Sequence, residues 1–274
     1  SAASDVYKRQ QYFLRLAHSA ATELEGACQG QWLDRLERDH DNLRAALSIF
    51  LASDPLTGLS LATALQGFWW LRGHLREGRQ WLTTLLAARE DHPATPERSL
   101  ATTARAQALF AAGRLAWAQG DYGAARELCQ NSLAIWEEVD SSPGRADALH
   151  LLGTLANWEA DSSSARPLLE QSLALRRLAG DTRGIAESLF ELGLLYLFAG
   201  DHAAASPLFE QSLALRRTTG GGVEITYALG LQGWTSIMRG DFGTARRRLR
   251  ETLPTLMGLG DRWGLPFWLN CAAH

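Results

Sequence analysis

Between residues 106 and 265, apolar-rich stretches long enough to form helices are separated by short breaks. Each unit of 40 residues holds two apolar-rich stretches, separated by a short break that carries Gly-Asp or Ala-Asp in most units. Glycine readily adopts the left-handed conformation that ends a helix, and aspartate accepts hydrogen bonds from the free amides that begin the next one. The pattern predicts antiparallel pairs of helices joined by tight turns.

Four columns of identical residues repeat at an interval of 40 residues, which sets the length of the unit. The columns are Gly113, Gly153, Gly193 and Gly233; Asp121, Asp161, Asp201 and Asp241; Ala125, Ala165, Ala205 and Ala245; and Leu133, Leu173, Leu213 and Leu253. A fixed period of a few tens of residues marks a solenoid, in which each unit buries its apolar face against its neighbours. We expect an all-α repeat region at 97–274. It would contain units near 106–145, 146–185, 186–225 and 226–265, followed by a truncated unit.

One unit resembles the tetratricopeptide repeat particularly well. Its matching residues are Leu192, Gly193, Tyr196, Gly200, Asp201, Ala205 and Phe209. That family has a usual period of about 34 residues, so longer helices and links would account for the extra length here. Ala160 in place of glycine and Gln232 in place of leucine depart from the pattern. The resemblance implies a right-handed superhelical solenoid of antiparallel helix pairs, with a concave groove lined by the first helix of each pair.

Residues 11–92 carry a second resemblance, in the runs 32–37, 39–47, 68–74 and 78–82. These runs are similar to the helical segment that follows the nucleotide-binding module in bacterial ATPase transcription regulators of the NB-ARC or STAND type, in the LuxR-type and antibiotic-regulatory groups. The resemblance implies that this chain is the sensor arm alone, and that ATP and DNA would bind to modules upstream of it. The turn from Gly73 to Gly78 also fits a degenerate first repeat.

We expect helices near 11–27, 31–52, 57–72, 76–90 and 98–119. Two prolines in the segment 91–96 disfavour helix there and predict a linker. Residues 5–10 resemble a translated transposon adapter used in library preparation, and Lys8 within them is the only lysine beside 26 arginines. We therefore expect residues 1–10 to be a non-native leader.

The composition is that of an ordinary domain. A net charge of −3 gives no general attraction to DNA or to anionic membranes, and no apolar run approaches the length of a membrane span. The three cysteines, Cys28, Cys129 and Cys271, are far apart in the sequence and odd in number. We expect a cytoplasmic protein with free thiols.

Motifs for catalysis and cofactors are absent from the sequence. A Walker A loop needs a lysine after its last glycine, and Lys8 follows Tyr7. The chain has no H-E-x-x-H, C-x-x-C or G-x-S-x-G motif. Gly220-Gly221-Gly222 falls where neighbouring units have a turn between repeats, so it predicts a turn and not a phosphate loop. We therefore expect no enzyme activity, no catalytic residue, no metal site and no cofactor in this chain.

The predicted groove has an apolar and aromatic lining. By correspondence with tetratricopeptide arrays, its residues are Trp70, Phe110, Arg114, Trp117, His150, Thr154, Asn157, Phe190, Leu194, Leu197, Tyr227, Trp234 and Ile237. Apolar surfaces of this extent usually mark an interaction site, suited to an amphipathic helix, a peptide or a small apolar effector. The alternative is that these aromatic residues pack on one another as core. His150 and Asn157 are either polar anchors in the groove or hydrogen-bonded structural residues.

Two functions remain compatible with these features. The favoured one is a protein- or effector-binding arm of a signal-transducing transcription regulator, with no direct contact to nucleic acid or membrane. The alternative is a free-standing scaffold that joins two proteins, and an unrecognised enzyme ranks behind both. The arginines Arg246, Arg247, Arg248 and Arg250 predict a solvated helix face or a docking surface for an acidic partner.

Overall fold

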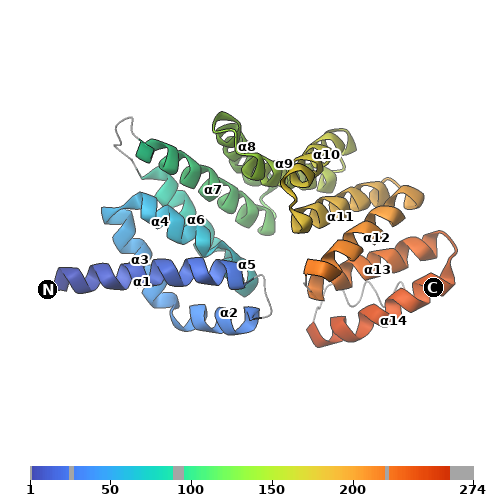
Figure 1. Cartoon of the computed structure of the whole chain (residues 1–274), viewed down its shortest axis with the longest axis horizontal. Coiled ribbons are helices and arrows are strands. Elements are labelled where there is room, and N and C mark those ends of the chain that lie inside the picture. Colours follow the sequence, from blue (N-terminus) through green and yellow to red (C-terminus); the bar gives the residue numbers. More distant parts are fainter. Residues whose placement is uncertain (1, 25–27, 89–95, 220–221, 260–274) are drawn as a thin grey trace. The chain divides into compact units, whose positions relative to one another are not determined.

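The computed structural model describes residues 2–24, 28–88, 96–219 and 222–259. Over these residues it contains only helices and turns, fourteen α-helices in all (Figure 1), which confirms the all-α prediction. The first six are α1 (Ala2–Glu23), α2 (Gln29–Arg38), α3 (His40–Ser53), α4 (Pro55–Ala64), α5 (Gln66–Arg72) and α6 (Leu75–Ala87). The others are α7 (Pro96–Ala118), α8 (Tyr122–Glu138), α9 (Ser142–Trp158), α10 (Ser162–Ala179), α11 (Thr182–Phe198), α12 (His202–Thr219), α13 (Gly222–Met238) and α14 (Phe242–Leu259).

The chain folds as two compact units, residues 1–151 and 152–274, which divide within α9. The repeat boundaries expected from the sequence rest on residue columns and not on compactness, so they stay predictions. Residues 91–95 of the expected linker 91–96 lie outside the described residues, whereas Pro96 is the first residue of α7. The truncated unit after residue 259 also lies outside the described residues, as does Cys271. Helix α1 begins at Ala2, inside the expected non-native leader, whose origin also stays a prediction.

The first unit packs α1 to α7 around one apolar core. Its largest fully buried side chains are Trp69, Phe68, Leu36, Leu43, Leu47, Leu59, Leu61, Leu65, Leu82 and Leu85. Burial of a side chain of this size contributes about 1.5–3 kcal/mol, so this cluster supplies much of the stability of the N-terminal part. Ala108, Ala111 and Ala112 on α7 extend the same core into the first tetratricopeptide-like helix pair.

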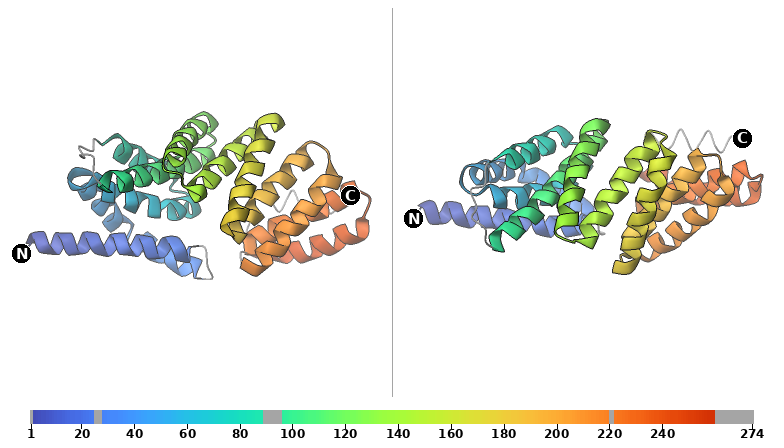
Figure 2. Two further views of the ribbon diagram at one scale, coloured as in Figure 1. Left: turned by 45° about the horizontal axis from the view of Figure 1, so that its top comes forward. Right: turned by 90° about the horizontal axis from the view of Figure 1, so that it is seen from above.

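The second unit is a series of antiparallel helices, each packed against the next (Figure 2). Leu169, Leu189 and Leu195 form a core between α10 and α11. A second core between α11, α12 and α13 contains Phe209 and Leu231. Each helix therefore buries its apolar face against its neighbours in the chain, as the repeat pattern predicts.

The turns within the helix pairs follow the pattern expected from the sequence. Gly120, Gly200 and Gly240 have φ of 77°, 78° and 77°, in the left-handed region. The aspartate after each one caps the next helix, and Asp201 Oδ1 accepts a hydrogen bond from the backbone amide of Ala204 at 2.9 Å. Asp121, Asp161 and Asp241 accept equivalent bonds from the amides three residues further on. The capping role predicted for the aspartate column is confirmed.

Ala160 keeps the same turn without a glycine. Its φ is 60°, and its amide donates to Asn157 O at 3.1 Å while the amide of Asp161 donates to Ala156 O at 2.9 Å. A residue with a Cβ costs about 1–2 kcal/mol in this conformation. The departure noted in the sequence therefore leaves the backbone unchanged and stores strain at one turn.

The glycine column lies where the two helices of a pair cross. A Cβ added to Gly193 would lie 2.6 Å from Cε1 of Phe209, and one added to Gly153 would lie 2.7 Å from Cγ of Leu169. Each glycine therefore leaves space for a large side chain on the second helix of its pair, Phe209 or Leu169. That side chain comes four residues after the alanine of the repeated column, Ala205 or Ala165. A larger residue in the glycine column would push the pair apart, as the sequence predicts.

Two of the expected helices are wrong in their extent, because the structure breaks each one. The predicted helix 31–52 is divided at Asp39 into α2 and α3, and the predicted helix 57–72 is divided at Leu65 into α4 and α5. At both residues the backbone shifts toward the bridge region, with φ and ψ of −93° and 7° at Asp39 and −81° and −5° at Leu65. Neither break contains proline or glycine, so the sequence carries no signal for it.

Candidate functional site

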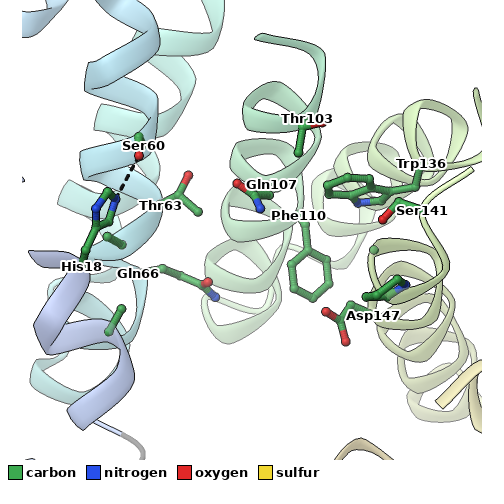
Figure 3. Close-up of a pocket in the computed structure, with 14 residues that line it drawn as sticks. His18, Ser60, Thr63, Gln66, Thr103, Gln107, Phe110, Trp136, Ser141 and Asp147 are labelled. Atoms are coloured by element: carbon green, nitrogen blue, oxygen red, sulfur yellow. Dashed lines mark hydrogen bonds between the residues drawn. The ribbon is translucent and has the colours of Figure 1, made fainter. Parts of the chain in front are cut away.

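A pocket of about 470 Å³ opens in the first unit between α1, α4, α5, α7, α8 and α9 (Figure 3). Helix α7 supplies Thr103, Gln107 and Phe110, whose spacing of four and three residues places them on one face of the helix. The remaining walls come from helices far apart in the sequence. The pocket therefore depends on the N-terminal hairpins as well as on the repeats.

One wall of the pocket is polar. His18 on α1 and Ser60 on α4 are joined by a hydrogen bond of 3.0 Å between Nε2 and Oγ (Figure 3). One turn further along α4, the Oγ1 atom of Thr63 is buried, and none of the described residues forms a hydrogen bond with it. A buried hydroxyl without a partner costs about 1–3 kcal/mol, so Thr63 contributes an unsatisfied polar group to this wall of the pocket.

The facing wall is aromatic and rigid. Trp136 on α8 is 5% exposed and packs with Ala106 and Ala148. A Cβ on Gly144 would overlap the Trp136 ring, so the indole lies directly on the backbone of α9. Phe110 is half-buried beside it. Together these two side chains offer a flat apolar surface opposite the polar wall.

The structure brings three of the predicted groove residues together next to this pocket. Trp70 on α5 stacks on Trp117 on α7, with ring centroids 5.6 Å apart and an angle of 13° between the planes. The guanidinium of Arg114 lies 5.4 Å from the centroid of the Trp70 ring, a cation–π contact. In the amide orientation that satisfies both groups, Arg114 Nε also donates to the Gln66 side chain at 3.1 Å. This stack connects α5 to α7 beside Phe110.

The predicted groove residues of the second unit lie against its core. Leu194 is 9% exposed, and Phe190, Leu197, Trp234 and Ile237 are partly buried against the same cluster. Phe190 meets Phe209 edge to face at 5.6 Å. In this unit the packing favours the core interpretation over a free groove lining. The side chain of Tyr227 lies outside the described residues.

The two predicted polar anchors occupy different units. His150 is half-buried on α9 in the first unit. Asn157 is 4% exposed in the second unit, where its side chain interacts with the carboxyl group of Glu191. Thr154, between them on the same helix, is 4% exposed. The burial of Asn157 and Thr154 agrees with structural roles.

Glu191 on α11 is a buried titratable group that the sequence did not indicate. The pKa of its carboxyl group is raised to about 7, chiefly by burial and also by the negative charge of Glu187. The positive charge of Arg216 and the contact with Asn157 act in the opposite direction. In the 40-residue repeat, Glu191 occupies the position of Ala111, next to the predicted groove residue Phe190. No motif in the sequence distinguishes it from a surface glutamate.

Sequence reasoning also missed most of the pocket. Of its residues, only Phe110 is in the predicted groove set. His18, Ser60 and Thr63 belong to helices outside the 40-residue repeat, so no column of the pattern includes them. Trp136 is a single aromatic residue on a second helix, a position that the groove analysis did not include.

Comparison with known proteins identifies the repeats. The sequence model of the tetratricopeptide repeat matches residues 101–177 and 158–218. This part of the chain therefore consists of tetratricopeptide repeats. Of the helices in the described residues, none combines the length and the apolarity that crossing a bilayer requires.

A putative HTH-type transcriptional regulator of Mycobacterium tuberculosis is 35% identical to this chain over 111 residues. The matched segment covers 40% of this chain and 12% of the regulator, so the chain corresponds to a small part of that protein. Homologous regulators from a second strain of that organism and from Mycobacterium bovis match equally well.

Two solved structures show the same fold at low sequence identity. BtubC from P. vanneervenii has a TM-score of 0.64 and 15% identity, with coverage of 86% of this chain and 93% of that chain. A Rap protein in complex with Competence and Sporulation Factor has a TM-score of 0.68 and 12% identity, with coverage of 97% of this chain and 80% of that chain. These likenesses concern the fold alone.

Proposed function

We propose that this chain is the non-catalytic, peptide- or protein-binding arm of a signal-transducing bacterial transcription regulator. The observation that carries the binding role is the pocket of the first unit, with a buried, unpartnered Thr63 hydroxyl opposite the rings of Phe110 and Trp136. The match to putative transcriptional regulators supports the regulatory context. A regulator of this kind works in the cytoplasm, where its DNA is.

The lining of the pocket favours a peptide over a small apolar effector. Side-chain amides and hydroxyls of Thr63, Gln66 and Gln107 provide both donors and acceptors, as the backbone of an extended peptide requires. Asp147 also lines the pocket. The Rap protein of similar fold was solved with a bound factor, so this type of helical array accommodates such a guest.

Binding in the pocket offers a direct route to a signal. A guest that contacts α1 and α4 on one side and α8 and α9 on the other would stabilise one arrangement of these helices over others. The guest can shift the equilibrium between two arrangements only by the difference in its affinity for them, and that shift is what a larger protein would respond to. The arm would therefore act as a sensor by restricting its own N-terminal hairpins.

A random-peptide display selection against the full chain tests the binding role. Peptides that it enriches should bind Thr63→Val about tenfold more weakly, because the variant removes the open hydroxyl at constant shape. Phe110→Ala should weaken binding by at least as much through loss of apolar contact. Tyr122→Ala, a truncation of an aromatic residue exposed on α8 away from the pocket, serves as the control and should bind normally.

The selection has two outcomes that would refute the pocket. Either no peptide is enriched, or enriched peptides bind Thr63→Val and Phe110→Ala as tightly as the native chain, as measured by fluorescence anisotropy. The regulatory context has its own test, the sequence of the DNA on both sides of this reading frame. We expect a nucleotide-binding module and a DNA-binding domain in the same chain, and their absence would favour a free-standing scaffold.

A further inference from the structure

Two helix junctions of the first unit bring histidine and glutamate side chains together, away from the pocket. The α2–α3 junction carries Glu37 and His40, and the α5–α6 junction carries His74 and Glu77. Each pair is separated by three residues, so both members lie on the same side of their junction. We call these four residues the His–Glu cluster, and we propose that it binds a divalent transition-metal ion of the Zn²⁺ class.

The backbone positions His74 through one left-handed residue. Gly73 has φ of 80° and ends α5, which lets the chain turn directly into α6 at His74. Helices α2 and α5 are in contact, so this turn faces the α2–α3 junction. The rings of His40 and His74 lie with their centroids 4.5 Å apart, and His40 is only 8% exposed. Two imidazoles that share one carboxylate at this distance are a typical ligand set for a transition metal.

Three ligand atoms converge on one point. Glu37, His40 and His74 each offer one ligand atom, and these atoms all lie within 4.8 Å of one another. Oε1 of Glu37 is 3.2 Å from Nε2 of His74 and 4.0 Å from Nδ1 of His40. With metal–ligand bonds of about 2.0–2.1 Å, tetrahedral ligand atoms stand about 3.3 Å apart. The Glu37–His74 edge already has this length, and the Glu37 side chain, 43% exposed, is free to move the remaining distance.

The hydrogen bond to Glu77 orients the His40 ring so that its Nδ1 faces Glu37. A carboxylate only accepts, so Nε2–H of His40 donates to Oε1 of Glu77 at 3.1 Å, which leaves the lone pair of Nδ1 for a metal. Arg44 fixes Glu77 in turn, donating from Nε at 2.8 Å and from Nη2 at 2.6 Å. A ligand histidine whose second nitrogen donates to a carboxylate is the usual outer-shell arrangement of metal sites.

Metal binding would replace the hydrogen bond between His74 and Glu37 with a bond from His74 to the ion. In the metal-free protein Nε2 of His74 donates its hydrogen to Glu37. When the metal binds, that proton moves to Nδ1 of the same ring, and the freed lone pair on Nε2 coordinates the ion. Arg72 lies on the other side of Glu37, with Nε 3.9 Å from Oε2, and so leaves Oε1 available. Two neutral imidazoles and one carboxylate suit Zn²⁺ with a fourth position for water.

The site would join the α2–α3 junction to the α5–α6 junction. Neither glutamate–histidine pair forms a recognised metal motif in the sequence, since the two pairs are separated by more than thirty residues of chain. This is why a search for metal motifs predicted none. The proposal is independent of the peptide pocket, because none of its four residues lines that pocket.

Isothermal titration of the full chain with ZnCl₂, after treatment with EDTA, tests the proposal. We expect one equivalent of Zn²⁺ to bind, an increase in unfolding temperature with free Zn²⁺, and visible absorption from Co²⁺ in its place. His74→Gln should abolish all three. Glu77→Gln should weaken Zn²⁺ binding about 10- to 100-fold, because it loosens the orientation of His40 without removing a ligand.

The matched control is His202→Gln, the same substitution on α12 in the second unit, which should leave Zn²⁺ binding unchanged. Circular dichroism of each variant shows whether it remains folded. The proposal is overturned if the native chain binds no Zn²⁺, which would make the cluster an ion-pair network only. It is also overturned if folded His74→Gln binds Zn²⁺ with native affinity, because the ion would then bind elsewhere.

Discussion

Glu191 shows how one buried residue couples this fold to pH. Its Oε2 atom is inaccessible to solvent, and the carboxyl group lies near Arg216, Glu187 and Asn157. Burial raises the pKa to about 7 from an ordinary value of 4.5. The folded protein therefore holds a proton on this side chain at pH values where the unfolded chain has released it.

The free energy of unfolding should decrease as the pH rises from about 4.5 to about 7. In this window the folded state binds more protons than the unfolded state, so the slope of stability against pH is negative. Each unit of pKa difference is worth about 1.4 kcal/mol, so the free energy of unfolding should fall by an amount on the order of 3 kcal/mol across this window.

Glu191→Gln should remove this pH-dependent loss. The variant should therefore be more stable than the native protein at pH 8, as measured by urea denaturation at several pH values.

Glu210→Gln, the same substitution at an exposed position on α12, is the control and should follow the native pH dependence. A Glu191→Gln variant whose stability falls with pH as steeply as that of the native chain would mean that this carboxyl group is already ionised in the folded protein.

At the scale of the helix pair, a buried arginine connects one pair to the next. Arg176-Arg177 and Arg216-Arg217 lie in the last turns of α10 and α12, where positive charge is favourable. The structure gives Arg176 a more specific role. Arg176 is 4% exposed, and its Nη1 donates to Gly184 O at 2.8 Å and to Ser188 Oγ at 3.1 Å on α11. Arg177 is exposed.

Arg176→Ala should lower the free energy of unfolding by about 3 kcal/mol. The substitution removes a buried, hydrogen-bonded cation and leaves the carbonyl of Gly184 and the carboxylate of Glu187 without it. Arg177→Ala, at the neighbouring position, should change stability by less than about 0.5 kcal/mol. Chemical denaturation of the two variants checks the difference, and equal effects would assign the stabilisation to charge at the helix end alone.

Elements that depend on local residues were predictable, whereas those that depend on distant contacts were not. The glycine turns and aspartate caps follow from a few adjacent residues, so the repeated pattern located them correctly. The breaks at Asp39 and Leu65 contain no local breaker such as proline or glycine, so they depend on the packing of the whole first unit. The pocket is a still larger case, since His18, Thr63 and Trp136 meet only after the N-terminal hairpins have folded onto the first repeat.

For the whole molecule, stability in a repeat array is a sum over neighbouring units. Gly193→Ala places a Cβ 2.6 Å from the buried ring of Phe209, and should cost about 1–3 kcal/mol through overpacking. The loss should stay near the altered pair. Hydrogen exchange should therefore increase in α11 and α12 while α3 and α4, in the first unit, keep native protection.

Gly243→Ala is the matched control within the second unit. Its added Cβ would have Asp241 Oδ1 as nearest atom at 3.7 Å, so it should be neutral or stabilise the helix by up to about 1 kcal/mol. Faster exchange throughout the chain in Gly193→Ala would show instead that the two units unfold together.

The shared design of the turns has a consequence for how such a chain changes over generations. The second helix of every pair from α8 onward begins with the same aspartate cap, and the left-handed residue before it gives each turn the same backbone path, even where alanine replaces glycine. An in-frame duplication or deletion of 40 residues within the second unit would rejoin two equivalent ends and leave the flanking helices in register. Such an event would change the length of the array by one whole repeat and would leave the residues of the pocket, all in the first unit, in place.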